Sequence, residues 1–470
     1  RPKRFLTAPI AVGTIDQALL AVMQSNHSHL RAVALERSLL VVDEVHASDT
    51  YMRGLLTRLL RHHVAAGGRA LLLSATLGSS LRDRLLKPDG APFVPASYDD
   101  AVARSYPLLS TSSGREIPVA SRSQSPKRVW IDCQQALSEP AQLSPQVAEA
   151  IGRGGRVLIV LNTVARAIEV QRALEADASI AAQLFSVRGT TCPHHGRFAR
   201  VDRELMDASV SERMGKGSAD TPLVLVGTQT LEQSLDIDAD WLITDLCPMD
   251  VLLQRVGRLH RHERSRAAAF ARARATVLVP AIEDLADWIQ RDGRVRGPAG
   301  LGSVYSDLRV MQRTLDELRR RTSIEIPREN RLLVERATHA DMLDALDSPS
   351  WRAHRGLLLG GQMMQAGAAE AACVREDCGF LDSELRFRQL DERIVTRLGL
   401  EDRRVMLGET FVSPFGASLS ELSIPGWMAG DCVEEQPDGP VRVTSGGLCF
   451  DYGGHEFTYS RFGLERSTGA

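Results

Sequence analysis

The chain has 470 residues, 43% of them hydrophobic and 25% charged, a composition typical of a folded protein with two or three domains. Its formal net charge of −2 excludes binding to nucleic acid through bulk charge, so contacts with a polyanion must come from local basic surfaces. Seven cysteines without a framework of short spacings favour a reducing cytoplasm over a disulfide scaffold. No apolar run approaches the roughly 18 residues that span a bilayer, so we expect a cytoplasmic protein without a membrane partner.

Apolar runs and helical patterns alternate along the first 285 residues. The runs are short and continuous, as in fully buried strands, and they lie at 38–43, 69–74, 129–132, 156–161, 183–187, 222–228, 241–245 and 276–279. Helical patterns lie at about 14–25, 50–65, 163–176, 200–210 and 249–258. This alternation predicts an α/β fold of doubly wound lobes built on parallel sheets.

The composition changes at three points, which gives four expected domains. A Ser-, Arg- and Pro-rich stretch near 110–127 separates the rest of a first lobe (1–127) from a second lobe (128–285). The next segment, 286–405, is expected to be helical because apolar residues follow a 4-3-4-3 spacing at Val304, Leu308, Met311, Leu315 and Leu318. Short alternating segments rich in glycine and proline predict a small β-containing module at 406–470.

Two adjacent acids, Asp43 and Glu44, follow the first apolar run. Ligands of doubly wound sheets bind at the carboxyl ends of the strands, where carboxylates are costly unless a cation or donor meets them. A magnesium ion on a nucleotide would meet both carboxylates, with Asp43 holding the metal and Glu44 polarising the attacking water. The alternative for an isolated Asp-Glu pair is a solvated acidic turn.

Residues near this pair extend the hypothesis. His46 would sense the γ-phosphate and connect the acidic pair to the next motif. Ser74 and Thr76 follow the second apolar run, and their hydroxyl groups could hydrogen-bond the acidic pair and relay its state. Alone, this Ser-Ala-Thr string carries little information.

A basic string near residue 254 supplies candidate phosphate contacts. Gln254, Arg258 and Arg261 recur at spacings of four and three, which on a helix places them on one face. An arginine that stabilises a transferring phosphoryl group can contribute about 10³ to 10⁵ in rate. Gly257 would cost this helix about 1 kcal/mol, which indicates close approach by some other group. The alternative is a solvated basic helix face.

Four strings, in this order, resemble motifs II, III, V and VI of superfamily 2 DExD/H-box helicases: DEVHASD (43–49), LLLSATL (71–77), GTQTLEQSLDIDAD (227–240) and LLQRVGRLHRH (252–262). They look most like the CRISPR-associated helicase-nuclease of type I interference systems. GTIDQ (13–17), HGRFARVDR (195–203) and IPREN (326–330) support this likeness, which covers about residues 8–340. It implies two RecA-like lobes, the first incomplete, then the helical segment and the small C-terminal module.

The resemblance also implies the function and the roles of individual residues. The expected activity is ATP-dependent 3′→5′ travel on single-stranded DNA in antiviral defence, after a guide-RNA surveillance complex opens the duplex. ATP and magnesium are the implied cofactors, and Arg258 and Arg261 the arginine fingers. The cofactor-binding candidates are Ser74, Thr76, Glu232, Asp236 and Gly257. The nucleic-acid-binding candidates are Thr14, Gln17, Asn162, Thr163, Arg197, Thr228, Gln229 and Gln233.

The sequence departs from the family pattern in two ways. It contains no GxxxxGK[ST] phosphate loop, and only 42 residues precede Asp43, so we expect a fragment whose phosphate loop lies upstream. None of the twelve histidines is followed by aspartate, as the family's nuclease requires, so the nuclease domain is expected elsewhere in the gene or on a separate chain. An RNA helicase, or a non-catalytic clamp or recruitment subunit, stays open as an alternative.

Overall fold

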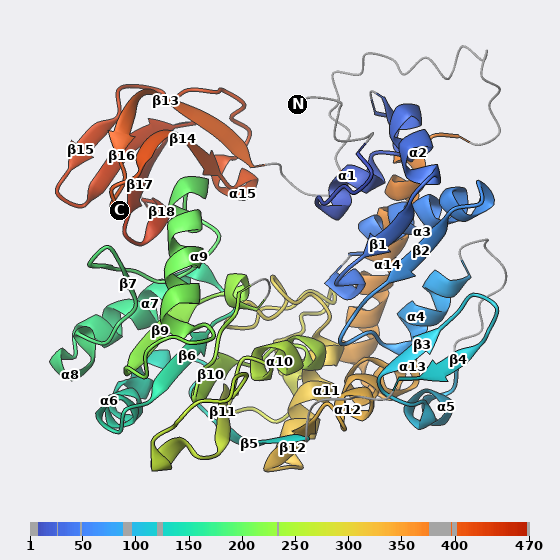
Figure 1. Cartoon of the computed structure of the whole chain (residues 1–470), viewed down its shortest axis with the longest axis horizontal. Helices are drawn as coiled ribbons and strands as arrows, with labels where there is room; N and C mark the ends of the chain where they lie inside the picture. The colour runs from blue at the N-terminus through green and yellow to red at the C-terminus, as the bar shows by residue number, and fades with distance from the viewer. Residues whose placement is uncertain are drawn as a thin grey trace. The chain divides into compact units, whose positions relative to one another are not determined.

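The computed structural model describes residues 8–25, 27–47, 49–87, 96–119, 126–232, 235–375, 396 and 402–467. These residues form two compact units, which we call unit 1 and unit 2 (Figure 1). Unit 1 comprises the described residues within 1–122, 291–294 and 338–398. Unit 2 comprises those within 123–290, 295–337 and 399–470.

Unit 1 is built around a parallel β–α–β connection. Strand β1 (Leu39–Val42) pairs in parallel with β2 (Arg69–Leu72), and α3 (Thr50–Ala65) connects them. Asp49 caps α3 by accepting a hydrogen bond from the backbone N–H of Met52 at 2.8 Å. The other elements of the first 119 residues are α1 (Ile15–Leu19), α2 (Ser28–Glu36), a 3-10 helix (Val45–Ala47), α4 (Ser79–Leu86), α5 (Tyr98–Ala103), β3 (Leu108–Ser110) and β4 (Glu116–Pro118).

Two later helices complete unit 1: α13 (Ala340–Asp344) and α14 (Pro349–Ala372). Helix α14 packs along α3, where a Cβ placed on Gly54 would lie 2.8 Å from the Cβ of Ala369. The end of α14 is fixed by Gln24, whose side-chain amide donates to the carbonyls of Ala371 at 3.1 Å and Cys373 at 2.9 Å. The core of unit 1 therefore joins segments that are more than 300 residues apart in the chain.

Unit 2 contains a six-stranded sheet with the strand order β12-β5-β11-β10-β6-β9. All neighbours are parallel except β12 and β5, which confirms the α/β class expected from the alternating pattern. The strands are β5 (Lys127–Gln134), β6 (Arg156–Val160), β9 (Leu223–Gly227), β10 (Trp241–Asp245), β11 (Ala273–Leu278) and β12 (Ser323–Ile326). Every residue of β6, β9 and β10 is buried, as the continuous apolar runs predicted.

Helices surround this sheet (Figure 1). The helices are α6 (Ser144–Gly152), α7 (Val164–Glu175), α8 (Ala178–Ala181), α9 (Arg200–Met214), α10 (Met249–Val256), α11 (Leu308–Arg319) and α12 (Asn330–Thr338). Two short strands, β7 (Ser186–Val187) and β8 (Thr190–Thr191), and 3-10 helices at Pro140–Leu143, Gln229–Leu231, Ala268–Phe270 and Leu285–Trp288 complete the unit's first part. The predicted strand at 183–187 is thus mostly an irregular segment.

The predicted amphipathic helix is α11. Leu308, Met311, Leu315 and Leu318 are all buried in it, whereas Val304 precedes the helix and is 43% exposed. The segment 286–405 does not stay together, because α11 and α12 belong to unit 2 while α13 and α14 belong to unit 1. The four domain boundaries stay predictions.

The C-terminal module contains β13 (Arg403–Val412), β14 (Ser418–Ile424), α15 (Gly426–Ala429), β15 (Arg442–Thr444), β16 (Gly447–Tyr452), β17 (His455–Ser460) and β18 (Gly463–Arg466). Strands β13 and β14 form a hairpin, and β15 to β18 form an antiparallel sheet. Asp202 of α9 fixes this module, because its carboxylate accepts hydrogen bonds from Ser413 Oγ at 2.6 Å and Tyr459 Oη at 2.5 Å.

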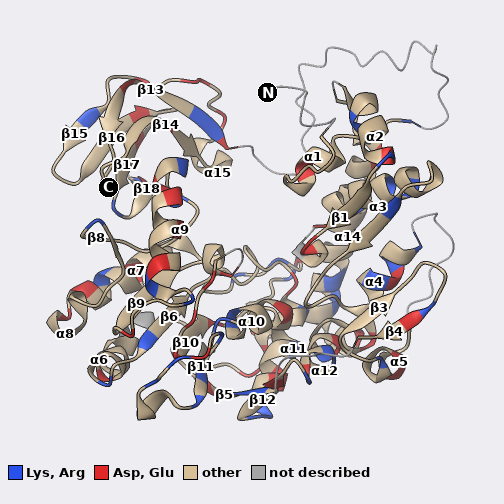
Figure 2. Cartoon of the chain, viewed as in Figure 1, with Lys and Arg blue, Asp and Glu red and all other residues tan. Residues whose placement is uncertain are grey.

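Acidic and basic residues are interspersed along the elements of both units, in keeping with the near-neutral net charge (Figure 2). None of the helices among the described residues combines the length and the apolar character that a bilayer span requires.

We predict that Gly54→Ala destabilises the protein by about 1 to 3 kcal/mol, because the new methyl group would overlap Ala369 and force α3 and α14 apart. The matched control is Gly360→Ala in α14, where a Cβ would meet nothing within 4 Å. That variant should gain up to about 1 kcal/mol from helix propensity. Urea denaturation measures both; a stabilised Gly54→Ala variant would contradict the close packing of the two helices.

Candidate active site

The acidic pair lies at the carboxyl end of β1, on a strained turn. Asp43 Oδ1 accepts a hydrogen bond from the backbone N–H of Glu44 at 2.9 Å, and Glu44 has a φ of 51°. A left-handed backbone at a residue other than glycine costs about 1 to 3 kcal/mol and persists where its surroundings enforce it. The positive φ of Glu44 lets the chain turn sharply after β1. Asp43 is exposed and Glu44 half-buried.

His46 connects this turn to the Ser-Ala-Thr string. Its Nδ1 lies 2.8 Å from Ser74 Oγ and 3.3 Å from Glu44 Oε2. Ser74 Oγ also accepts from the backbone N–H of Thr76 at 3.3 Å. We expected the hydroxyl groups to hydrogen-bond the acidic pair directly. The structure instead places His46 between Ser74 and Glu44, so any relay from the acids would pass through the imidazole.

The acids suit a magnesium ion that is shared with a phosphate. Oε2 of Glu44 is buried and has no hydrogen-bond partner of suitable geometry among the described residues. Over the same residues, no group of three or more histidine, cysteine, aspartate or glutamate side chains could hold a metal on its own. Magnesium usually binds one or two carboxylates together with substrate phosphates and water. Asp43 and Glu44 therefore fit a metal that a nucleotide brings with it.

In unit 2, polar side chains meet at the carboxyl ends of β6, β9 and β10. The Asp245 carboxylate accepts from the backbone N–H of Asn162 at 3.0 Å and from Arg166 at 2.7 and 3.0 Å. The Asn162 side chain donates to the carbonyls of Leu246 at 2.8 Å and Ala299 at 3.0 Å. These hydrogen bonds fix the carboxyl ends of β6 and β10 relative to each other.

Arg255 is a central residue of this edge that the sequence analysis missed. It is fully buried, and its guanidinium lies 2.6 Å from Glu232 Oε1 and donates to Asn162 Oδ1 at 3.1 Å and Tyr305 Oη at 3.0 Å. Burial alone would lower the pKa of Arg255, but the nearby Cys247 and Glu232 raise it above its ordinary value. The arginine therefore stays charged inside the protein.

A sequence signal for Arg255 existed. It lies between Leu252 and Val256, both fully buried, on the apolar side of α10. An arginine within an apolar helical stripe requires a buried acid as its partner. That partner is Glu232, which was predicted to bind the cofactor. Only 7% of Glu232 is exposed, and its carboxylate is committed to Arg255.

The expectation that Gln254, Arg258 and Arg261 share one helix face is wrong. Helix α10 ends at Val256, and Gly257 is its C-cap residue. A Cβ on Gly257 would lie 3.0 Å from the carbonyl of Gln254, so the tight helix end itself accounts for the glycine. Gln254 is half-buried on the last turn of the helix.

The two expected arginine fingers have different surroundings. The guanidinium of Arg258 donates to the backbone carbonyls of Glu232 and Leu235, so it holds the motif V segment. The side chain of Arg261 is 42% exposed and lies 3.2 Å from Asp236 Oδ1. Of the two, Arg261 has the more accessible guanidinium.

Asp236 is the acid of this exposed group. His262 Nε2 lies 2.8 Å from its Oδ1, and the backbone N–H of Lys216 donates to its Oδ2 at 3.1 Å. Burial would raise the pKa of Asp236, but these hydrogen bonds and the charges of His262 and Arg261 hold it below its ordinary value. Asp236 is therefore ionised at neutral pH and half-accessible.

The expected nucleic-acid contacts in unit 2 divide into buried and accessible residues. Asn162 and Thr228 are 1% and 2% exposed, so they support backbone segments and do not present side chains to a strand. Thr163 caps α7, and the Gln229 amide donates to the Asn162 carbonyl at 2.8 Å. Gln233 lies outside the described residues.

The remaining expected contacts lie elsewhere. The guanidinium carbon of Arg197 is 5.1 Å from the centre of the Trp427 ring, and burial lowers the pKa of Arg197. In unit 1, Thr14 is exposed at the start of α1. Gln17 accepts a hydrogen bond from Arg31 at 3.3 Å.

Several proteins that are similar to this chain in sequence or structure are described as Cas3. Residues 153–264 match the family described as CRISPR-associated nuclease/helicase Cas3, C-terminal. The CRISPR-associated endonuclease/helicase Cas3 of Escherichia coli (strain K12) is 36% identical over 324 residues, which cover 66% of this chain and 34% of that protein. The crystal structure of T. fusca Cas3-ATP has a TM-score of 0.75 and 26% identity, covering 99% of this chain and 58% of that one. A chain in a CRISPR RNA-guided surveillance complex, pre-nicking, has a TM-score of 0.74 and 26% identity, over 98% of this chain and 61% of that one.

The fold defines the class: an α/β protein consistent with RecA-like lobes, whose fold matches that of Cas3 structures, as the sequence predicted. Within that class, the chain is similar to the helicase portion of Cas3 proteins, which confirms the resemblance expected from its motifs. It spans 34% of the length of the Escherichia coli relative and 33% of that of the Thermus thermophilus relative.

We predict that Arg255→Met destabilises unit 2 by about 3 to 5 kcal/mol, because the Glu232 carboxylate is left buried without its partner. The double variant Arg255→Met/Glu232→Leu should recover much of this loss, since it removes both charges. Arg404→Ala, in an exposed ion pair of the C-terminal module, is the control and should change stability by less than about 0.5 kcal/mol.

The midpoint of guanidinium-induced unfolding separates these variants. If the double variant is as unstable as Arg255→Met, then the bonds to Asn162 and Tyr305, not the unpaired carboxylate, account for the loss.

Proposed function

We propose that this chain is the motor portion of an ATP-dependent helicase that moves 3′→5′ along single-stranded DNA in CRISPR defence. Its similarity to Cas3 proteins supports the helicase assignment, and a similar structure named Cas3-ATP supports ATP as the nucleotide. A further neighbour lies in a CRISPR RNA-guided surveillance complex, which supports a complex of that kind as the recruiting partner. The nuclease domain would belong to the same gene or to a separate chain.

The observation that carries the hydrolysis proposal is the Asp43–Glu44 turn. It combines an exposed carboxylate, a strained residue and a buried carboxylate oxygen that no described residue meets with hydrogen-bond geometry. Residues held in strained conformations cluster at active sites. A merely solvated acidic turn would leave Glu44 Oε2 open to water.

In the proposed mechanism, Asp43 would hold magnesium, directly or through water, and the Glu44 carboxylate would accept a proton from the attacking water. Bound ATP and magnesium would supply the transferable phosphoryl group and neutralise part of its charge. His46, 3.3 Å from Glu44 and 2.8 Å from Ser74, orients the glutamate and connects it to Thr76.

In unit 2, we assign the phosphoryl-stabilising role to Arg261, with Asp236 orienting its guanidinium across 3.2 Å. Arg258 is a positioning residue that holds the segment carrying Asp236. For the tracked strand we propose contacts with its sugars and phosphates, which make movement largely independent of sequence. The proposed contacts are Thr14, Gln17, Thr163, Arg197, Gln229 and Gln233.

Glu44→Gln should lower the ATP turnover of the intact protein by at least about 10², because the amide cannot accept the proton. Nucleotide affinity should stay within about threefold, since Asp43 and the shape of the turn are retained. Exposed Glu409→Gln is the control and should leave turnover unchanged. Release of phosphate and equilibrium binding of a fluorescent ATP analogue give the two quantities. Turnover that survives in Glu44→Gln would remove the water-activating role.

Arg261→Ala should reduce ATP turnover by about 10³, with little change in single-stranded DNA affinity or thermal stability. Arg258→Ala should instead lower the free energy of unfolding by about 1 to 3 kcal/mol, because the carbonyls of Glu232 and Leu235 lose their donor. Turnover assays, DNA-binding anisotropy and denaturation compare the two variants. Equal losses of turnover and DNA affinity in Arg261→Ala would place this arginine on the strand and not on the nucleotide.

A further inference from the structure

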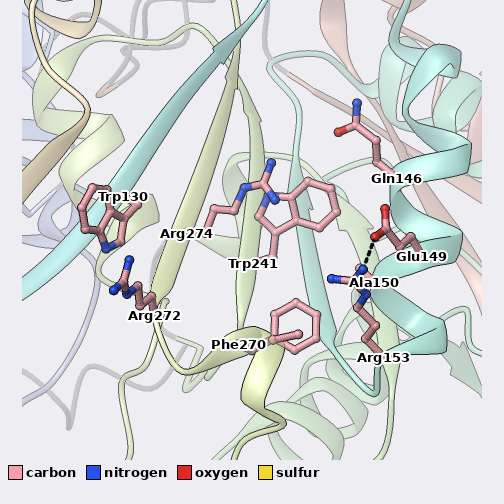
Figure 3. A pocket seen from close by; sticks show the side chains of 10 residues that line it. Trp130, Gln146, Glu149, Ala150, Arg153, Trp241, Phe270, Arg272 and Arg274 are labelled. Carbon is pink, nitrogen blue, oxygen red and sulfur yellow. Dashed lines mark ion pairs between the residues drawn. The ribbon is translucent and has the colours of Figure 1, made fainter.

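A pocket of about 390 Å³ opens beside the sheet of unit 2. Its walls come from β5, β10, β11, α6 and the 3-10 helix Ala268–Phe270 (Figure 3). The lining residues are Trp130, Gln146, Glu149, Ala150, Arg153, Trp241, Ala269, Phe270, Arg272 and Arg274. Trp241 begins β10 and Arg274 is the second residue of β11, so the pocket lies toward the amino ends of these strands. Asn162 and Asp245 lie at the opposite, carboxyl ends.

The pocket wall alternates planar aromatic and guanidinium groups. In the sheet register, Arg274 pairs with Trp130 on one side and with Trp241 on the other, so the three side chains form one row on the same face. The guanidinium carbon of Arg274 lies 5.1 Å from the Trp241 ring centre, and that of Arg272 lies 5.3 Å from the Trp130 ring centre. Figure 3 shows both pairs at the pocket wall.

These contacts hold two cations in place without using their N–H groups. Cation–π contact occupies the flat face of a guanidinium, and the N–H groups at its edge stay able to bind an anion. Arg272 has no hydrogen-bond or ion-pair partner among the described residues, and Arg274 has only a loose one, Asp132 at 3.6 Å. Arg153 is already paired with Glu149 at 2.6 Å. The uncompensated positive charge of the pocket therefore lies at Arg272.

The part of the pocket formed by Trp241 and Phe270 is apolar and closely packed. Trp241 is 3% exposed and its Nε1–H donates to Thr276 Oγ1 at 3.0 Å, so the indole presents no unsatisfied polar group. The Phe270 ring packs so closely against Gly155 that a Cβ added to this glycine would lie 2.3 Å from the ring. On α6, the half-buried Gln146 offers an amide donor and acceptor at the rim.

We propose that this pocket binds a nucleoside phosphate, either as a free nucleotide or as one unit of a single strand. The base would stack on the planar row formed by Trp130 and the two arginines, and the phosphate would bind the N–H edges of Arg272 and Arg274. Gln146 would contact the edge of the base. The volume lies near the lower end of the range of about 300 to 1,000 Å³ for small-molecule sites, which suits one such unit.

Binding of a nucleotide is favoured over binding of an acidic peptide because the pocket combines an aromatic ring with guanidinium groups. A carboxylate would use the arginines but would leave the exposed face of Trp130, which is 36% exposed, without a stacking partner. The inference does not depend on ATP hydrolysis by the Asp43–Glu44 turn, because the pocket lies wholly within unit 2.

Fluorine NMR of the chain labelled with 5-fluorotryptophan tests the proposal locally. The five tryptophans are Trp130, Trp241, Trp288, Trp351 and Trp427, and single Trp→Phe variants assign their resonances. The probes are AMP, a short oligothymidylate, inorganic phosphate and an acidic peptide that contains phenylalanine. We expect AMP to shift Trp130 and Trp241 while the other three resonances stay in place. The oligothymidylate should shift the same two, together with Trp427, which contacts the proposed strand contact Arg197.

Arg272→Ala should weaken both nucleotide probes by about tenfold, because it removes a charge-assisted contact. Arg404→Ala, an arginine outside the pocket, should have no effect. An oligothymidylate that binds at least about tenfold more tightly than AMP identifies a strand as the natural ligand, and equal affinities identify a free nucleotide. The proposal is overturned if no probe shifts Trp130, if phosphate alone reproduces the shifts, or if the peptide binds more tightly than either nucleotide.

Discussion

The buried ion pair between Arg255 and Glu232 is the interaction on which the carboxyl edge of the unit 2 sheet depends. A charged guanidinium inside a protein is tolerated only when acids and other acceptors surround it. Here the acceptors come from segments far apart in the chain, Asn162 after β6, Glu232 after β9, Thr244 in β10 and Tyr305 before α11. One side chain thereby fixes the relative positions of the loops that carry the candidate site.

This arrangement separates residues that build the site from residues that are available to a ligand. Glu232, Asn162 and Arg258 use their polar groups within the protein, although motif spacing makes them look like ligand contacts. Asp236 and Arg261 stay accessible at the surface of the same segments. These segments thus mix both kinds of residue, and a motif match alone does not distinguish them.

The sequence predicted those elements whose stability is local. Helix α3 and strand β10 have the predicted bounds, because an N-cap residue defines one and a continuous apolar run defines the other. The end of α10 was missed because tertiary hydrogen bonds replace helical ones there. The N–H of Ala239 donates to the Arg258 carbonyl and that of His260 to the Ala239 carbonyl, each at 3.0 Å. The hydrophobic periodicity of α10 contains no information about a tertiary hydrogen-bond partner such as Ala239.

For the candidate site, too, the sequence predicted local features but not the tertiary contacts. The acidic pair was predicted as a candidate because two carboxylates after an apolar run are unusual. The position of His46 between Glu44 and Ser74 depends on the strained turn, which no pattern reveals. Arg255 was missed because an arginine within a basic string suggests exposure. Its apolar neighbours on α10 indicated instead that the side chain is buried.

The C-terminal module is connected to the motif V segment through His194 and His195. Burial lowers the pKa of His195 to about 3, so the ring is neutral at physiological pH. A neutral ring with its proton on Nε2 satisfies both contacts, because Nε2 lies 3.0 Å from the Phe462 carbonyl and Nδ1 accepts from the N–H of Arg197 at 3.2 Å. The adjacent His194 carbonyl accepts from the backbone N–H of Thr228 at 3.0 Å.

Separating the module from α9 and the His194–His195 loop would leave several buried polar groups without partners. Asp202 would lose Ser413 and Tyr459, and His195 would lose Phe462, at a cost of about 1 to 3 kcal/mol for each group that stays dry. Burial also raises the pKa of Asp202, because its charge is already costly in this position. The module is therefore held to α9 and to the His194–His195 loop by several buried polar contacts, and this loop is hydrogen-bonded to Thr228.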